Sequence, residues 1–149
     1  MSECQDAVLR RVLALWLETK AGDQLPGTSF ADPFVLRFAL GSIVIYDVLR
    51  EPLRFRYRLV GTEIINRAGF DLTGQTQLDH PDPVFAQAAQ AGLERCVEIR
   101  APMILRGTRV IHGVKGDYEA IALPLVDGIG RVARILAVQR FAPGTPRLE

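Results

Sequence analysis

Residues 53–74 (LRFRYRLVGTEIINRAGFDLTG) constrain the fold most, because a strand pattern runs directly into a helical one. Apolar and charged residues alternate at the start of this stretch, which is typical of a half-buried strand. The predicted inward positions are Leu53, Phe55, Tyr57 and Leu59. The strand is expected to end at Gly61, and a short helix over 62–68 is expected to end at Gly69.

Residues 6–20 are predicted to form an amphipathic helix, because their apolar side chains recur at helical spacing. The apolar stripe includes Val8, Val12, Leu13 and Trp16. A stripe this wide must pack against something. Packing on the sheet of the same chain is the simpler prediction. A dimer interface with a second copy is the alternative, and one helix can serve both purposes.

Two Asp-Pro pairs, 32–33 and 82–83, are predicted helix starts, because Asp caps a helix and Pro fits its first turn. The first is expected to begin a short helix over 34–40, and the second a longer helix over 83–98. Strand patterns occur at 42–49, 53–60, 99–106, 117–126 and 132–141. Helices grouped between antiparallel strands predict an α+β fold.

The final strand pattern, 132–141, is apolar on both faces, so this strand is expected to be central and covered on both sides. The segment 107–116 is irregular and leaves open how its two flanking strands pair. The turn at 128–130 formally begins a Gly-x-Gly dinucleotide fingerprint. A strand pattern follows it instead of a helix, so a hairpin turn is predicted there.

Bulk properties exclude several classes of protein. A chain of 149 residues suits one domain, and a net charge of +1 provides no general attraction to nucleic acid or to an anionic membrane. The N-terminus lacks the pattern of a secretory signal, and no apolar run is long enough to span a bilayer. Cys4 and Cys96 do not form a disulfide framework. The expected location is therefore cytoplasmic, with no nucleic-acid or membrane partner.

Motifs for catalysis or metal binding are not found, so neither a catalytic residue nor a metal site is predicted. His80 and His112 have no second ligand at metal spacing, and prolines around His80 predict an exposed loop with a solvent-facing ring. Cys96 is expected to be a free buried thiol rather than a nucleophile. Serine is scarce, and no nucleophile elbow or phosphate-binding loop is present.

Three arginines, Arg54, Arg56 and Arg58, occupy the outward face of the strand over 53–60. The simpler prediction is a solvated face that pairs with acids such as Asp47. The alternative is a site for phosphate or for an acidic partner, because guanidinium groups bind both.

The strand sequence FRYRLVGT together with the turn DLTG resembles the PAS sensory domain, most closely the small single-domain PAS-like proteins of alphaproteobacteria. The resemblance implies a five-stranded antiparallel sheet, with short helices on one face and the N-terminal amphipathic helix on the other. A helix and a Gly/Pro-bearing connector are expected over 1–30, and the resemblance implies a PAS-like domain over 31–141. The tail over 142–149, with two Pro and one Gly, is expected to be flexible. The resemblance also implies a sensor or adaptor and not an enzyme.

The same resemblance implies a ligand cavity between the sheet and its helices. The candidate ligand contacts are Phe55, Tyr57, Phe70, Phe85 and Met103. Tyr57 stands out, because the hydroxyl of an inward tyrosine needs a partner and a ligand could provide it. The expected partners are a small-molecule ligand, a signalling protein and a second copy of the chain, and the cofactor is left unassigned.

Two alternatives remain open at this point. One is a cone-shaped α+β enzyme of the ketosteroid-isomerase type, in which Asp47 would be a general base in an apolar cavity. The other is a ligand-free interaction domain with a filled core.

Overall fold

One antiparallel sheet organises this computed structural model, which describes residues 4–111 and 113–141. The strands are β1 (Ile43–Leu49), β2 (Arg54–Val60), β3 (Met103–Ile111), β4 (Val114–Val126) and β5 (Val132–Phe141). Their order across the sheet is β2-β1-β5-β4-β3, so β5 is central, as predicted. The α+β fold with a five-stranded antiparallel sheet is confirmed. His112 and the tail expected over 142–149 lie outside the described residues.

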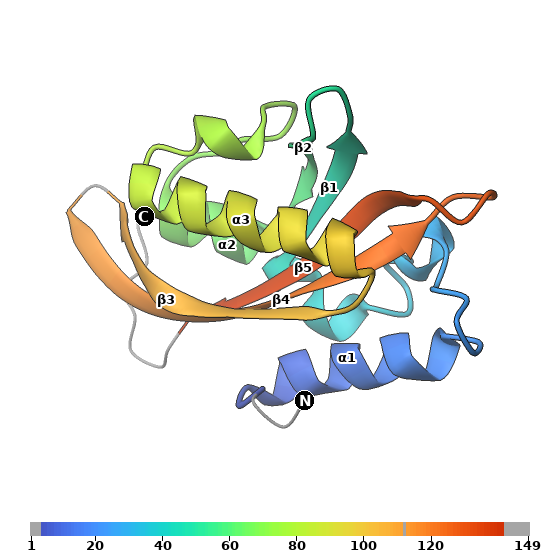
Figure 1. The fold of residues 1–149 in the computed structure, drawn as a ribbon. Helices are drawn as coiled ribbons and strands as arrows, with labels where there is room; N and C mark the ends of the chain where they lie inside the picture. Colours follow the sequence, from blue (N-terminus) through green and yellow to red (C-terminus); the bar gives the residue numbers. More distant parts are fainter. Residues whose placement is uncertain (1–3, 112, 142–149) are drawn as a thin grey trace.

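Helices cover both faces of the sheet (Figure 1). They are α1 (Ala7–Thr19), α2 (Thr62–Ala68) and α3 (Pro83–Ile99), with short 3₁₀ helices η1 (Thr28–Phe30), η2 (Arg37–Ser42) and η3 (Gln77–Asp79). On one face, α3 packs across β3 and β4; on the other, α1 packs against β4 and β5. This arrangement explains why the last strand is apolar on both faces. No described helix has both the length and the apolar character needed to cross a membrane.

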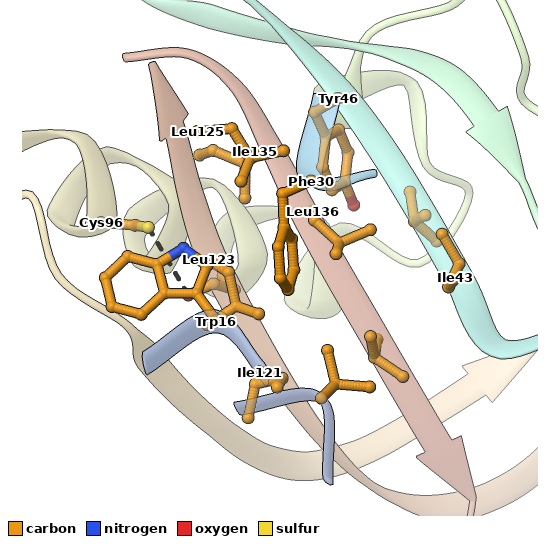
Figure 2. Packing of buried hydrophobic residues seen from close by; sticks show 14 of the residues in the cluster. Trp16, Phe30, Ile43, Tyr46, Cys96, Ile121, Leu123, Leu125, Ile135 and Leu136 are labelled. Carbon is orange, nitrogen blue, oxygen red and sulfur yellow. Dashed lines mark hydrogen bonds between the residues drawn. The ribbon is translucent and has the colours of Figure 1, made fainter. Parts of the chain in front are cut away.

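The apolar stripe of α1 is buried in the core of its own chain. Val12, Leu13 and Trp16 are buried, and Val8 is partly buried. The indole of Trp16 lies flat over the sheet beside Leu123 (Figure 2), and its Nε1 donates a hydrogen bond to the Pro124 carbonyl at 3.1 Å. The predicted dimer contacts therefore pack on the sheet of the same chain, and a second copy could reach only the outer side of α1.

Capping residues decide where the helices begin and end. The Asp82 carboxylate accepts hydrogen bonds from the backbone of Val84 and Phe85, both at 3.1 Å, and starts α3 as predicted. The helix ends at Arg100, which adopts a left-handed conformation at φ 55°. The strand predicted over 99–106 is present as β3, but its predicted start is wrong, because α3 and its cap occupy residues 99 and 100 and β3 begins at Met103.

Near the first Asp-Pro pair, the short helix predicted over 34–40 is present as a 3₁₀ helix, but it begins three residues later and ends at Ser42. Asp32 accepts a hydrogen bond from Phe34 at 2.8 Å, but the chain then forms a turn and the 3₁₀ helix η2. The irregular segment 107–116 belongs to a regular hairpin, in which β3 and β4 pair continuously from Met103 with Ala122 to Ile111 with Val114.

A β-bulge in β2 changes the predicted inward face. Tyr57 pairs with Tyr46, but the next pair is Leu59 with Ile45, so Arg58 is an extra residue in β2. Phe55 and Tyr57 point inward as predicted. Leu59 does not: it is 43% exposed, because the bulge shifts the alternation by one residue.

Candidate functional site

A cavity of about 60 Å³ lies between the sheet and the layer formed by α2 and α3. Its walls come from every strand and from both helices, so it is a product of the whole fold. The lining residues are Val44, Tyr46, Tyr57, Val60, Ile64, Ala68, Phe70, Leu72, His80, Phe85, Ala89, Leu93, Leu105, Tyr118, Ala120, Ile121, Ala122, Ala137 and Gln139. Almost all of them are apolar or aromatic.

Small side chains on the sheet leave the space open. Ala120 and Ala122 on β4 and Ala137 on β5 form the floor, and Ala122 is the cross-strand partner of Ala137. Every second residue of a strand faces the same side, so Ala120 and Ala122 both face α3. A single methyl group is too short to reach the side chains of the helix layer. Space is therefore left between the three alanines and that layer.

Four aromatic rings follow one another along one wall of the cavity. Centroids are 5.4 Å apart from Phe70 to His80, 4.6 Å from His80 to Phe85 and 5.4 Å from Phe85 to Tyr118. The first and last contacts are edge-to-face, the geometry that favours attraction between rings. The wall therefore joins the loop after α2, the start of α3 and strand β4.

His80 is buried, and the prediction of a solvent-facing ring is wrong. Only 6% of the residue is exposed, and the rings of Phe70 and Phe85 both pack against it. Its Nδ1 accepts a hydrogen bond from the backbone N–H of Asp82 at 3.1 Å. An accepting nitrogen carries no proton, so the neutral ring carries its proton on Nε2.

Tyr57 lines the cavity, as the sequence suggested, but its hydroxyl has a partner within the chain. It donates a hydrogen bond to Oε1 of Gln77, a fully buried side chain on η3. Gln77 in turn donates from Nε2 to the carbonyl of Ala86 on α3 at 3.0 Å. These two hydrogen bonds connect β2 to α3 beside the cavity. The Tyr57 hydroxyl therefore has a hydrogen-bond acceptor without a ligand.

The other candidate ligand contacts are divided between the cavity and the core. Phe70 and Phe85 line the cavity with Tyr57. Phe55 is fully buried against the edge of Tyr46, with centroids 6.4 Å apart, and Met103 packs partly buried on β3; neither lines the cavity.

Sequence reasoning missed His80, Tyr118, Gln139 and the alanine floor. Gln139 carried a usable signal, because it is an uncharged polar residue directly after the apolar run 135–138. The pattern Ala120-x-Ala122, opposite Ala137, is the other signal: it marks a strand face with little side-chain volume.

Among the described residues that line the cavity, no acidic or thiol side chain is present. Asp47, proposed above as a general base, does not line it and instead pairs with arginines on the sheet face that bears α1. Burial raises the pKa of the Cys96 thiol to about 12, so Cys96 stays protonated; its Sγ lies 3.6 Å from the Ala122 carbonyl. Within residues 4–111 and 113–141, no group of three or more His, Cys, Asp or Glu side chains could hold a metal ion.

The chain is similar to known proteins at the level of family and fold. A family model described as a PAS domain matches residues 4–139. No curated protein matches the sequence. Among solved structures, the dark structure of the blue-light photoreceptor Aureochrome1 LOV superposes with a TM-score of 0.57 and 15% identity, over 76% of this chain and 84% of that one.

Two further structures superpose equally well. One is described as "Flavin Analogue Sheds Light on Light-Oxygen-Voltage Domain Mechanism", with a TM-score of 0.56 and 20% identity, over 74% of this chain and 84% of that one. The other is VqmA bound to DPO, with a TM-score of 0.56 and 14% identity, over 73% of this chain and 56% of that one. At these identities the likeness establishes the fold alone.

Proposed function

The chain belongs to the PAS domain family, and we propose that it is a sensory signalling module that takes a small uncharged ligand into the cavity under α3. The observation that carries the proposal is the cavity itself, open above an alanine floor and lined by residues that are mostly buried. Enclosed apolar cavities with few polar groups are the usual form of a small-molecule site.

The lining decides the chemical class of the ligand. The described residues that form it include no Asp, Glu, Lys or Arg. A charged ligand would therefore lose its hydration without gaining an opposite charge, which is costly. The polar side chains His80 and Gln139 can orient one or two polar atoms of an otherwise apolar molecule.

The size of the cavity limits the ligand further. A volume of about 60 Å³ holds only a few heavy atoms, whereas pockets for drug-sized ligands span roughly 300–1,000 Å³. The three fused rings of a flavin do not fit this space. A light-driven step through a flavin is therefore no part of the proposal, although two of the similar folds are those of light-oxygen-voltage domains.

The sheet connects the cavity to α1, so it can transmit a structural change caused by ligand binding. β4 and β5 carry the alanine floor on one face and contact α1 on the other. Trp16 hydrogen-bonds to the carbonyl of Pro124, two residues beyond Ala122 on β4. A ligand that shifts the alanines of β4 and β5 would therefore also shift the backbone that α1 contacts. We propose that α1 changes position when the ligand binds.

Xenon is a suitable probe, because it enters dry apolar cavities of this kind. We expect xenon pressure to shift the amide NMR signals of Ala122 and Ala137. Ala137→Leu should abolish the response by filling the cavity, while Ala14→Leu, an equal enlargement on the exposed side of α1, should preserve it. Mass spectrometry of molecules released from the denatured protein would identify a retained ligand. No xenon response and nothing released would contradict the proposal.

A further inference from the structure

Three arginine side chains converge on one carboxylate on the sheet face opposite the cavity. Asp47 Oδ2 lies 3.1 Å from Arg56 Nη2 and 3.4 Å from Arg58 Nη1. Asp47 Oδ1 lies 3.4 Å from Arg134 Nε. The three arginines come from β2 and β5, on either side of Asp47 in β1, so the sheet itself sets their spacing.

The charges at this position do not balance. Three guanidinium groups face one carboxylate, which leaves an excess of two positive charges. The carboxylate is mostly covered, with 14% of its side chain exposed, whereas Arg56 and Arg58 are 46% and 50% exposed. Each guanidinium has five N–H donors, and one carboxylate cannot accept them all. Most of these donors are therefore not accepted by Asp47.

The bulge in β2 places an apolar side chain beside the arginines. Because Arg58 is the extra residue, both it and the adjacent Leu59 face outward, and Leu59 is 43% exposed. We call Asp47, Arg56, Arg58, Leu59 and Arg134 the arginine patch. It spans the β1–β2 hairpin and the start of β5, and the turn of this hairpin extends away from α1 (Figure 1). Bulges commonly re-aim side chains next to functional sites.

We propose that the arginine patch is the docking surface for an acidic segment of a protein partner. Carboxylates match the fork of a guanidinium in a bidentate geometry, and Leu59 offers an apolar contact next to it. The Asp47 carboxylate orients the arginine side chains and is mostly covered by them. A carboxylate of the partner therefore approaches the guanidinium N–H groups and not the Asp47 carboxylate. An excess of two charges suits a short acidic segment.

Nucleic acid fits the patch less well. Binding to duplex DNA neutralises many phosphates along an extended basic surface, and this chain carries a net charge of only +1. The proposal adds a partner to the sensory role and is tested separately from it, because the cavity and the arginine patch lie on opposite faces of the sheet.

The test uses a fluorescein-labelled peptide of Glu-Glu-Leu repeats, with a Gln-Gln-Leu peptide of equal length as its neutral counterpart. Fluorescence anisotropy at low salt measures the affinity of the whole chain for each. We expect binding of the acidic peptide alone, weakening at least about tenfold in Arg56→Gln/Arg58→Gln. The matched control, Arg95→Gln/Arg100→Gln, removes the same charge at the end of α3, on the other side of the sheet, and should bind within about twofold of the unchanged chain.

Each outcome decides the matter. Equal loss in both double variants would overturn the proposal, because it would show attraction to net charge alone. Absence of peptide binding, or binding only to vesicles rich in phosphatidylserine, would also overturn it. If circular dichroism shows that Arg56→Gln/Arg58→Gln fails to fold, peptide-induced NMR shifts in the unchanged chain take its place. Shifts centred on Arg56, Arg58 and Leu59 would support the patch, and shifts centred elsewhere would exclude it. Loss of xenon binding would leave this result unaffected.

Discussion

The carboxylate of Glu119 on β4 accepts a hydrogen bond from the backbone N–H of Asp6 at 2.8 Å, which ties the start of α1 to the sheet. The same carboxylate accepts from the backbone of Gln5 at 3.0 Å and pairs with Arg106 at 2.8 Å. Asp6 caps α1 through its own side chain and pairs with Arg140 on β5 at 3.2 Å. Polar contacts thus hold the first turn of α1, while Trp16 anchors its last turn.

Glu119→Gln should weaken this attachment. The amide keeps the shape of the side chain but has one acceptor oxygen and no charge for Arg106. We expect the free energy of unfolding in urea to fall by about 1–3 kcal/mol. Glu98→Gln, which removes a carboxylate from an exposed pair with Arg95, should change it by no more than about 0.5 kcal/mol. Equal losses in the two variants would contradict a special role for Glu119.

Protonation of Glu119 at low pH should weaken the attachment of α1 to the sheet. Desolvation pushes the pKa of Glu119 upward, but hydrogen bonds from Gln5, Asp6 and Arg106 outweigh it and hold the pKa below its ordinary value of 4.5. Folding therefore gains stability from Glu119 at pH values above 4.5, and this gain is lost as the pH falls through the lower folded value. Unfolding measured from pH 7 to pH 3 should show a smaller acid loss in Glu119→Gln than in the unchanged chain.

The rate at which the cysteines are alkylated should show whether the core opens. Burial raises the pKa of Cys96 to about 12, and desolvation, with Glu119 nearby, also raises that of Cys4. Because the thiolate is the reactive form, iodoacetamide at pH 8 should label the folded chain slowly at both positions. Labelling of Cys96 should accelerate in urea in parallel with unfolding. Rapid labelling of Cys96 in the folded chain would show that α3 opens locally.

The helices around the cavity could be predicted from residues close in the sequence, such as capping residues and glycines. The features that were not predicted depend on contacts between strands that are distant in the sequence. Helix α2 was predictable because Gly69 ends it with a positive φ of 84°. The end of α3 was predicted to within one residue, but the start of β3 at Met103 was not, because Arg100 adopts a left-handed conformation that arginine rarely takes. The outward turn of Leu59 follows from a bulge that only the pairing with β1 reveals.

The site was harder to predict than the fold, for a related reason. Tyr57, Phe70 and Phe85 were predictable as inward aromatic residues, but Phe55, of the same kind, packs in closed core. Whether an inward side chain meets a neighbour or an empty space depends on distant strands. His80 illustrates this, since flanking prolines suggest an exposed loop and only the folded chain brings its aromatic neighbours around it.

Trp16→Ala tests whether the stripe of α1 is core. Removing a fully buried indole leaves a cavity above β4 and deprives the Pro124 carbonyl of its donor. We expect the free energy of unfolding to fall by about 3–5 kcal/mol. Leu17→Ala, on the same helix but 52% exposed, should change it by no more than about 0.5 kcal/mol. A stable Trp16→Ala chain that sediments as a monomer beside a dimeric parent would instead favour a subunit interface.

Gly61 joins the end of β2 to the start of α2 at a point where the backbone passes very close to η2. A Cβ placed on Gly61 would lie 2.4 Å from the carbonyl oxygen of Gly41 and 2.6 Å from that of Leu40. The Gly61 N–H also donates to the carbonyl of Ile43 at 2.7 Å, so this backbone is held on both sides. The glycine is therefore required for close approach, since its φ of −65° is open to any residue.

Gly61→Ala should accordingly destabilise the fold through steric overlap with backbone that cannot move aside. We expect the free energy of unfolding in urea to fall by about 3 kcal/mol, the upper end of the usual cost of overpacking. Gly128→Ala is the matched control: it adds the same methyl group in the β4–β5 turn, where a Cβ would meet nothing within 4 Å. That variant should unfold within about 0.5 kcal/mol of the unchanged chain. If both variants were equally stable, the backbone at Gly61 would have to move away from η2 more readily than its hydrogen bond to Ile43 indicates.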